Sequence, residues 1–220
     1  MGKLVEIITP LHTRTARDYV GRMMDGKIHC SEVSRQYGRD YWDGDRRYGY
    51  GGYRYDGRWA PIARKLADTY ELPPNARILD VGCGKAHLLY ELSRLLPDAE
   101  VTGFDVSSYA IETAKEEIRD RLFIHKAEEP YPFDRGQFDL VLSLMTLHNL
   151  PLPQLAAALA EIERVGVRKY VAVESYRSVS ELFNLQCWAL TCESFLRPEE
   201  WLWVFEKAGY TGDYEFVFFT

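Results

Sequence analysis

The chain has 220 residues, of which 46% are hydrophobic and 14% aromatic, a composition typical of one folded domain rather than a disordered segment. Its formal net charge of −6 argues against general nucleic-acid binding, and no apolar run reaches the ~20 residues that a membrane helix needs. The four cysteines form no CxxC pair, so we expect reduced thiols, no metal site and a cytoplasmic location.

The charge is unevenly distributed along the chain. Residues 1–65 contain 13 Lys or Arg and 8 Asp or Glu, whereas residues 66–220 contain 14 and 25. A basic N-terminal part favours a small anionic partner through its local field. The alternative is a chance distribution of surface charge.

The chain divides near residue 75 into a predicted N-terminal cap, residues 1–74, and a core, residues 75–220. In the core, strand and helix signals alternate. They predict an α/β fold, a Rossmann-like, doubly wound, mostly parallel sheet with a helical and loop-like N-terminal cap. A lone strand after Pro198 leaves the sheet edge, and the choice between monomer and homodimer, open. The predicted strands are 77–81, 100–104, 122–125, 138–144, 169–174 and 214–219, and the predicted helices are 85–96, 107–120, 153–165, 180–190 and 198–208.

Residues 37–59 of the cap interleave tyrosines and arginines with glycines, unlike an amphipathic helix or an alternating strand. Because this segment directly precedes the core, we expect it to fold over the ligand of the core as a lid. Two alternatives are stacking of single-stranded nucleic acid on the tyrosines, which the acidic core disfavours, and an ordered packing loop. Candidates for contact with a substrate are Tyr48, Tyr53, Arg54 and Tyr55.

The strongest signal is the glycine loop in residues 78–87, ILDVGCGKAH, between the first predicted strand and helix. Gly82 and Gly84 allow a tight turn, and the following helix presents unpaired N–H groups to a ligand. A dinucleotide-binding loop has a glycine at the third place of GxGxxG, where this chain has His87. The loop therefore fits NAD poorly.

Asp105 ends the second predicted strand, about 20 residues beyond the glycines. A carboxylate there can accept hydrogen bonds from both ribose hydroxyls of an adenosine. The alternative is the N-cap of the next helix. Together with the glycine loop, the ribose contact is favoured.

These landmarks resemble the cofactor half of the class I S-adenosylmethionine-dependent methyltransferases. Residues 80–86 are similar to motif I, DxGxGxG, with Ala86 at the third glycine; residues 126–133 are similar to the loop GDAxxLPF, and residues 137–150 to FDxVxSxxxLHHL. The resemblance implies S-adenosylmethionine as the cofactor. Lys126 stands where an aspartate is common, which makes Glu128 the substitute contact to the adenine. In the lid, Arg58 is the candidate for the cofactor carboxylate. The other expected cofactor contacts are Asp80, Gly82, Cys83, Gly84, Asp105, Val106, Ala127, Ser143 and Leu144.

Methyl transfer from a sulfonium needs mainly in-line positioning, and a base only where the acceptor holds its proton. The resemblance places His148 at the mouth of the acceptor pocket, and its neutral-range pKa makes it a candidate base. Glu174 ends the fifth predicted strand, where it can orient or deprotonate the acceptor, and Tyr176 beside it is a further substrate contact. Structural packing of His148 and helix capping by Glu174 are the alternatives.

The predicted function is S-adenosylmethionine-dependent methyl transfer to a small acceptor, anionic or sugar-derived. The lid and residues 210–216 resemble uncharacterised methyltransferases of bacterial surface-polysaccharide pathways, which points to a sugar derivative. Two alternatives stay open: a catalytically silent protein that binds an adenosyl ligand on the same fold, and an NAD-type oxidoreductase.

Overall fold

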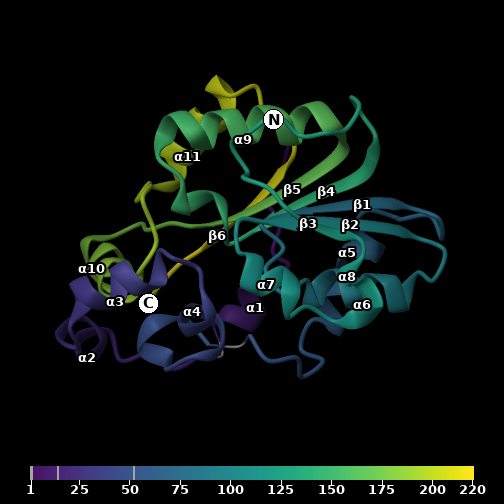
Figure 1. Cartoon of the computed structure of the whole chain (residues 1–220). Coiled ribbons are helices and arrows are strands. Elements are labelled where there is room, and N and C mark those ends of the chain that lie inside the picture. The colour runs from purple at the N-terminus through teal and green to yellow at the C-terminus, as the bar shows by residue number, and fades with distance from the viewer. Residues whose placement is uncertain (1, 14, 52) are drawn as a thin grey trace.

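The computed structural model describes residues 2–13, 15–51 and 53–220 (Figure 1). Its centre is a six-stranded sheet in the order β3-β2-β1-β4-β5-β6, and every pairing is parallel. The predicted doubly wound α/β fold is confirmed, and the sheet is parallel throughout. The strands are β1 (Arg77–Val81), β2 (Glu100–Asp105), β3 (Leu122–Ile124), β4 (Phe138–Leu144), β5 (Gly166–Glu174) and β6 (Asp213–Val217).

Helices cover both faces of the sheet, which explains why its central strands are apolar along most of their length. In β4, Leu140 and Leu142 pack into one core, and Val141 packs into the other. Helices α5 to α8 cover the first face, and α9 and α11 cover the second (Figure 1). These helices are α5 (Ala60–Thr69), α6 (His87–Leu95), α7 (Ser108–Glu112), α8 (Glu116–Arg119), α9 (Leu152–Val165) and α11 (Pro198–Lys207).

The single helix predicted for residues 107–120 is wrong, because the chain forms two short helices, α7 and α8. Ser107 caps α7 as expected, its hydroxyl accepting from the Ala110 N–H at 3.1 Å. The helix stops at Thr113, whose hydroxyl donates back to the Tyr109 carbonyl at 2.6 Å. Such local bonds compete with helix continuation, and Lys115 is extended, with φ −55° and ψ 132°.

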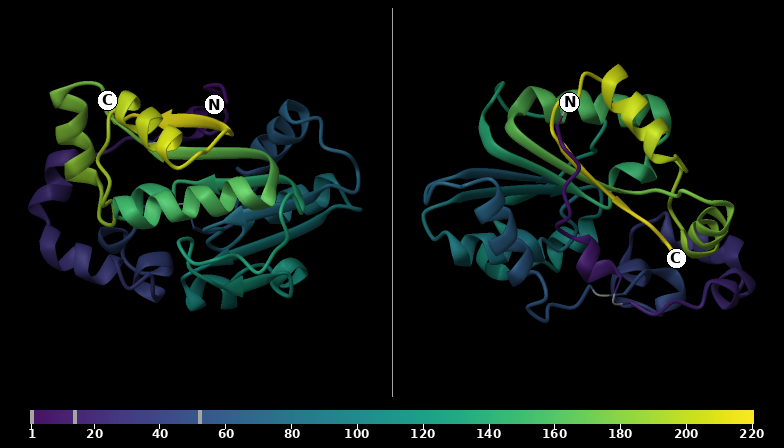
Figure 2. Two further views of the ribbon diagram at one scale, coloured as in Figure 1. Left: turned by 90° about the horizontal axis from the view of Figure 1, so that it is seen from above. Right: turned by 180° about the vertical axis from the view of Figure 1, so that it is seen from behind.

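The outer edge of β6 is covered by the N-terminus of the chain. Leu4 forms a parallel bridge with Tyr214, and the Val5 N–H donates to the Tyr214 carbonyl at 3.0 Å. Figure 2 shows the N-terminal segment running beside β6. The edge left open by the sequence is therefore paired at this point, which protects it from pairing with another chain.

The side chain of Glu215 in β6 anchors the same N-terminal segment. Its side chain is 1% exposed and accepts from the backbone N–H groups of Ile7, Ile8 and Thr9, at 2.6, 3.0 and 2.6 Å. The Tyr170 hydroxyl donates to the same carboxylate. These bonds hold the first part of the cap against β5 and β6.

The cap continues beside α10, at the carboxyl end of the strands (Figures 1 and 2). The expected lid is described at residues 37–51 and 53–59, and Gly52 lies outside the described residues. The described part contains two short helices that the sequence did not predict, α4 (Arg39–Asp43) and η1 (Arg46–Tyr48). Asp45 starts η1 by accepting from the Arg47 N–H at 3.0 Å. Because α5 packs against α6, the end of the predicted cap joins the helical layer of the core, and the boundary at residue 75 stays a prediction. The remaining helices are α1 (Thr9–His12), α2 (Tyr19–Met24), α3 (Lys27–Ser34), α4 (Arg39–Asp43), η1 (Arg46–Tyr48), η2 (Leu147–Asn149) and α10 (Val179–Trp188).

No helix in the described part of the chain has the length and apolar character needed to span a bilayer.

Candidate functional site

The glycine loop joins β1 to α6 at the carboxyl edge of the sheet. Gly82 has a left-handed φ of +76°, and a Cβ on it would lie 2.3 Å from Cγ2 of Thr146. The Thr146 hydroxyl donates to the Gly82 carbonyl at 3.3 Å. Glycine is therefore required here, because the turn packs directly against the segment that follows β4.

Asp105 at the end of β2 faces this loop. Its Oδ2 accepts from the Gly84 N–H at 2.8 Å, and its Oδ1 accepts from the Ser107 N–H at 2.9 Å. Burial raises the pKa of this carboxyl group, against the lowering effect of its backbone hydrogen bonds. The Val106 side chain beside it is 48% exposed. An oriented carboxylate next to an exposed apolar side chain suits a sugar that carries a flat apolar ring.

Asp80 of β1 carries an unused acceptor. The residue is 4% exposed, and its Oδ1 has no hydrogen-bond partner among the residues described. Burial, and then the charge of Asp105, raise the pKa of Asp80 to about 7. A buried oxygen without a partner costs about 1–3 kcal/mol, and a donor on a ligand would remove that cost.

Three of the remaining expected cofactor contacts bond within the core. Ser143 is fully buried and donates to the Val81 carbonyl at 3.0 Å, which ties β4 to β1 below the loop. The Cys83 thiol lies 3.7 Å from the Gly84 carbonyl, and the Ala127 carbonyl accepts from the Tyr131 hydroxyl at 2.9 Å.

The other expected contacts differ in their surroundings. Leu144 and Glu128 are half-buried. Arg58 is paired with Asp56 in the lid, with Nε 2.8 Å from Oδ2. The role of each in cofactor binding stays a prediction.

Helix α4 of the lid lies on the glycine loop. A Cβ on Gly84 would be 2.7 Å from the ring of Trp42, and Nε1 of that ring donates to the Ser107 hydroxyl at 2.8 Å. Next to it, the buried Lys85 ammonium contacts Asp43 Oδ1 at 2.6 Å. The sequence did not single out Trp42, Asp43 or Lys85 for these contacts, although the first two fall in the predicted lid.

His148 and Glu174, the two candidate catalytic residues, lie together in the structure. The Glu174 N–H donates to Nδ1 of His148 at 3.3 Å, so Nε2 carries the proton, and it lies 3.5 Å from Oε2 of Glu174. Both side chains are almost fully buried, and that Oε2 has no hydrogen-bond partner in the described chain.

The protonation states of this pair are set mainly by burial. Burial, and secondarily the charge of His12, lower the pKa of His148 to about 3. Burial raises the pKa of Glu174 to about 8, although Arg17 and Lys27 act in the opposite direction. At neutral pH the histidine is neutral and the carboxyl group is largely protonated.

The five candidate substrate contacts are not gathered at one place. Tyr48 packs against His29 of α3, and the Tyr55 hydroxyl donates to Glu91 of α6 at 2.6 Å. Tyr53 packs against Trp42 with ring centroids 4.6 Å apart, Arg54 is exposed, and Tyr176 lies under Arg197. Their substrate role stays a prediction.

Met145, which directly follows β4, has a left-handed φ of +57°. Its N–H donates to the Ala172 carbonyl at 2.9 Å, which holds this conformation. Such backbone strain, typically about 1–3 kcal/mol, concentrates at functional sites. No sequence signal marks it, because methionine has no preference for this conformation.

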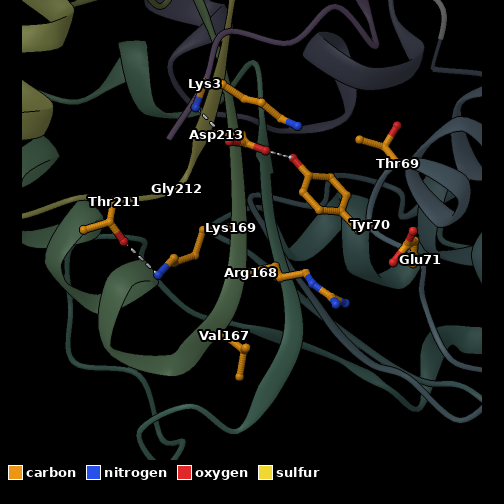
Figure 3. Close-up of a pocket in the computed structure, with 10 residues that line it drawn as sticks. All are labelled: Lys3, Thr69, Tyr70, Glu71, Val167, Arg168, Lys169, Thr211, Gly212 and Asp213. Atoms are coloured by element: carbon orange, nitrogen blue, oxygen red, sulfur yellow. Dashed lines mark hydrogen bonds between the residues drawn. The ribbon is translucent and has the colours of Figure 1, made fainter. Parts of the chain in front are cut away.

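A surface cavity of about 330 Å³ lies at the amino ends of β5 and β6, away from these residues (Figure 3). Its Tyr70 hydroxyl donates to Asp213 at 3.2 Å, and the Lys169 ammonium lies 3.2 Å from the Thr211 hydroxyl. The strand direction separates it from Asp105 and Glu174, so it is not part of the candidate site.

Comparisons with known proteins agree with this geometry. The family described as methyltransferase domain matches residues 78–167. The chain is 30% identical over 98 residues to an uncharacterized methyltransferase of Synechocystis, covering 44% of this chain and 45% of the relative. It is 31% identical over 111 residues to nocamycin O-methyltransferase of Saccharothrix syringae, covering 47% and 40%. The matched region thus spans less than half of either relative.

A solved structure of geranyl diphosphate methyltransferase, in complex with GPP and sinefungin, has a TM-score of 0.54 to this fold. The two chains are 18% identical over 66% of this chain and 58% of the other. Sinefungin is an analogue of S-adenosylmethionine. The family match identifies residues 78–167, which contain the glycine loop and Asp105, as a methyltransferase domain of the class I type, a family whose cofactor is S-adenosylmethionine.

Proposed function

We propose that the protein transfers the methyl group of S-adenosylmethionine to a small acceptor, anionic or sugar-derived. The observation that carries the proposal is the polar arrangement at the carboxyl ends of β1 and β2. There, Asp105 is oriented by two backbone N–H groups, and Asp80 keeps a buried oxygen without a partner in the described structure.

The residues fit the cofactor in separate parts. In this proposal Asp105 accepts from the ribose hydroxyls, Val106 packs against the adenine, and Asp80 attracts the ammonium of the amino-acid end. The bound cofactor supplies a methyl group made electrophilic by a sulfonium. The protein then supplies position and excludes water, which can account for much of the rate.

At the acceptor end, Glu174 is the proposed base and His148 holds it in place. Nε2 of His148 lies 3.5 Å from the same Oε2, which lacks a hydrogen-bond partner among the described residues. When ionised, this oxygen accepts the proton that the acceptor releases. Because burial holds the pKa of Glu174 at about 8, it can act as a base in the neutral to mildly alkaline range.

The lid must move in this proposal, because Trp42 lies on Gly84. We propose that α4 opens to admit the cofactor and closes again over it. Contacts of α4 with Ser107 and Lys85 hold the closed position.

The basic N-terminal part supports an anionic acceptor. The name of the nocamycin O-methyltransferase supports oxygen as the accepting atom. A cytoplasmic location, a surface-polysaccharide pathway and a monomer or homodimer complete the proposal; the free cysteines support the location.

Calorimetric titration of the full chain with S-adenosylhomocysteine, S-adenosylmethionine and NAD tests cofactor binding. We expect the two adenosyl ligands to bind and NAD to give no heat. Asp105→Ala should weaken S-adenosylhomocysteine about 100-fold, since two hydrogen bonds to a charged group are lost. Asp98→Ala, which removes an exposed carboxylate, is the control. Unchanged binding in Asp105→Ala would refute the proposed geometry.

A further inference from the structure

Three arginines of the cap surround one tryptophan at the end of α10. The guanidinium carbons of Arg17, Arg22 and Arg46 lie 5.3, 4.4 and 5.8 Å from the ring centre of Trp188. Trp188 itself is 6% exposed. We call these three residues the arginine cluster. Like charges gathered on one ring repel one another, so their arrangement calls for a compensating anion.

The described chain does not provide that anion at ion-pair distance. None of the arginine cluster lies within 4.0 Å of a carboxylate oxygen in residues 2–13, 15–51 and 53–220. Arg22 donates instead to the carbonyls of Trp188, Arg46 and Gly49. These bonds attach the cap to α10 but do not neutralise the positive charge of Arg22.

A fourth cation adds to the charge of this seam. The Lys27 ammonium donates to the Cys187 carbonyl at 2.8 Å and also to the Ala189 carbonyl. The carboxylate whose charge acts on both Lys27 and Arg17 is Glu174, and burial keeps it largely protonated at neutral pH. Four cations therefore gather where the cap meets α10: Arg17, Arg22, Arg46 and Lys27.

Donors remain for a ligand. Nε of Arg17 is buried and has no partner in the described structure, while its other nitrogens contact His12 and the Thr15 carbonyl. The Arg46 side chain is exposed and makes no hydrogen bond with the described residues. Glu174, 5% exposed with an unpartnered Oε2, lies on the same side at the end of β5.

We propose that the arginine cluster binds a carboxylate or phosphate group of the methyl acceptor, which places the accepting atom beside His148 and Glu174. Guanidinium groups match the geometry of both oxyanions. Arg17 and Arg46 recognise the group, and Arg22 holds the seam together. Arg17 and Arg22 are half-buried and Arg46 is exposed, so the group has access from solvent. This inference rests on the proposed function, because it assigns the acceptor of that same site.

The test uses the full chain saturated with S-adenosylhomocysteine and titrated with sodium acetate or sodium phosphate at constant ionic strength, adjusted with chloride. Thermal unfolding and tryptophan fluorescence report binding. We expect saturable stabilisation by at least one anion, and the acetate and phosphate arms identify which group the acceptor carries. Arg46→Gln should raise the dissociation constant at least fivefold. Arg135→Gln, which removes an exposed arginine before β4, is the matched control and should leave it unchanged.

Arg17→Lys separates recognition from packing, because it keeps the charge and removes the planar fork. If the arginine cluster only attaches the cap to α10, this variant unfolds at a lower temperature but keeps the anion dissociation constant. We expect that constant to rise as well. An equal response to chloride, acetate and phosphate, or Arg46→Gln equal to the unmodified chain, overturns the inference. Failure of S-adenosylhomocysteine to bind instead overturns the proposed function.

Discussion

The two ends of the candidate site are built differently. At the cofactor end, Asp105 bonds to Gly84 and Ser107, which lie 21 and 2 residues away in the chain. At the acceptor end, Arg22 bonds to the Trp188 carbonyl across 166 residues, and Tyr50 bonds to Leu190 across 140. The contacts of Asp105 lie within short motifs of the core, whereas those of Arg22 and Tyr50 form only when the cap packs against α10 and the residues that follow it.

That difference separates what is general from what is specific in this protein. The glycine loop and the end of β2 lie in the region that matches a known family, so other sequences share them. An acceptor end assembled from the cap, α10 and β5 can vary its residues without disturbing the loop. We therefore expect the choice of substrate to depend on how the cap packs against α10 and β5.

The largest effect should come from unseating the cap with Glu215→Ala. Three backbone N–H groups, of Ile7, Ile8 and Thr9, would lose a buried acceptor, at an expected cost of about 3–5 kcal/mol in unfolding free energy. Urea unfolding measures it, with Glu206→Ala, whose side chain is 73% exposed, as the control. Equal stability of the two variants would mean that the cap is held by other contacts.

A second variant, Glu174→Gln, probes the electrostatics of the acceptor end. The folded-state pKa of Glu174 is raised to about 8, so between the unfolded-state pKa and that value the native state holds a proton that the unfolded chain has released. Unfolding free energy should therefore fall as pH rises from about 4.3 to 8, on the order of 1 kcal/mol per pH unit. Above pH 8 the loss is complete.

Glu174→Gln removes that dependence, so its melting temperature should overtake that of the unmodified chain as pH rises. The control is Glu117→Gln, at an exposed position. Parallel melting curves from pH 5 to 9 for all three proteins would show that Glu174 does not titrate as its burial indicates.

Lys85 connects the glycine loop to the lid, because its ammonium contacts Asp43 of α4. Lys85→Met should weaken the closed position of the lid by about 1 kcal/mol and speed association of S-adenosylhomocysteine roughly fivefold. Stopped-flow fluorescence of Trp42, which lies on Gly84, follows the event.

Lys207→Met is the control for that variant, because its ion pair with Glu206 lies at the surface, with side chains 58% and 73% exposed. Identical association rates in the two variants would argue that α4 does not gate entry to the glycine loop.

The smallest effect concerns the cofactor end alone. Ala86, at the place of the third motif glycine, is left-handed with φ +55°. Ala86→Gly should raise the unfolding free energy by about 1 kcal/mol, because an L-residue pays for this conformation. Denaturant unfolding measures the gain, and Ala110→Gly in α7 should instead lower stability. A loss at both positions would contradict the assigned strain.

The sheet and the glycine loop could be predicted from sequence because their elements are local. The alternation of apolar strands and helices predicted the sheet. The glycine spacing predicted the loop after β1, which Asp105 at the end of β2 contacts. Glu174 was named because it ends a predicted strand and His148 because of the family resemblance, and the structure brings the two side chains together. The break between α7 and α8 was missed, since it depends on one threonine hydroxyl.

By itself, then, the sequence determined a doubly wound core with a cofactor loop at its carboxyl edge, because hydrophobic periodicity and glycine geometry act over short stretches of chain. Only the tertiary structure decided how the N-terminus pairs with β6, where Glu215 anchors the cap and which arginines meet at Trp188. Those contacts join residues as far as 210 positions apart, such as Lys3 and Asp213, and no local pattern encodes such pairings.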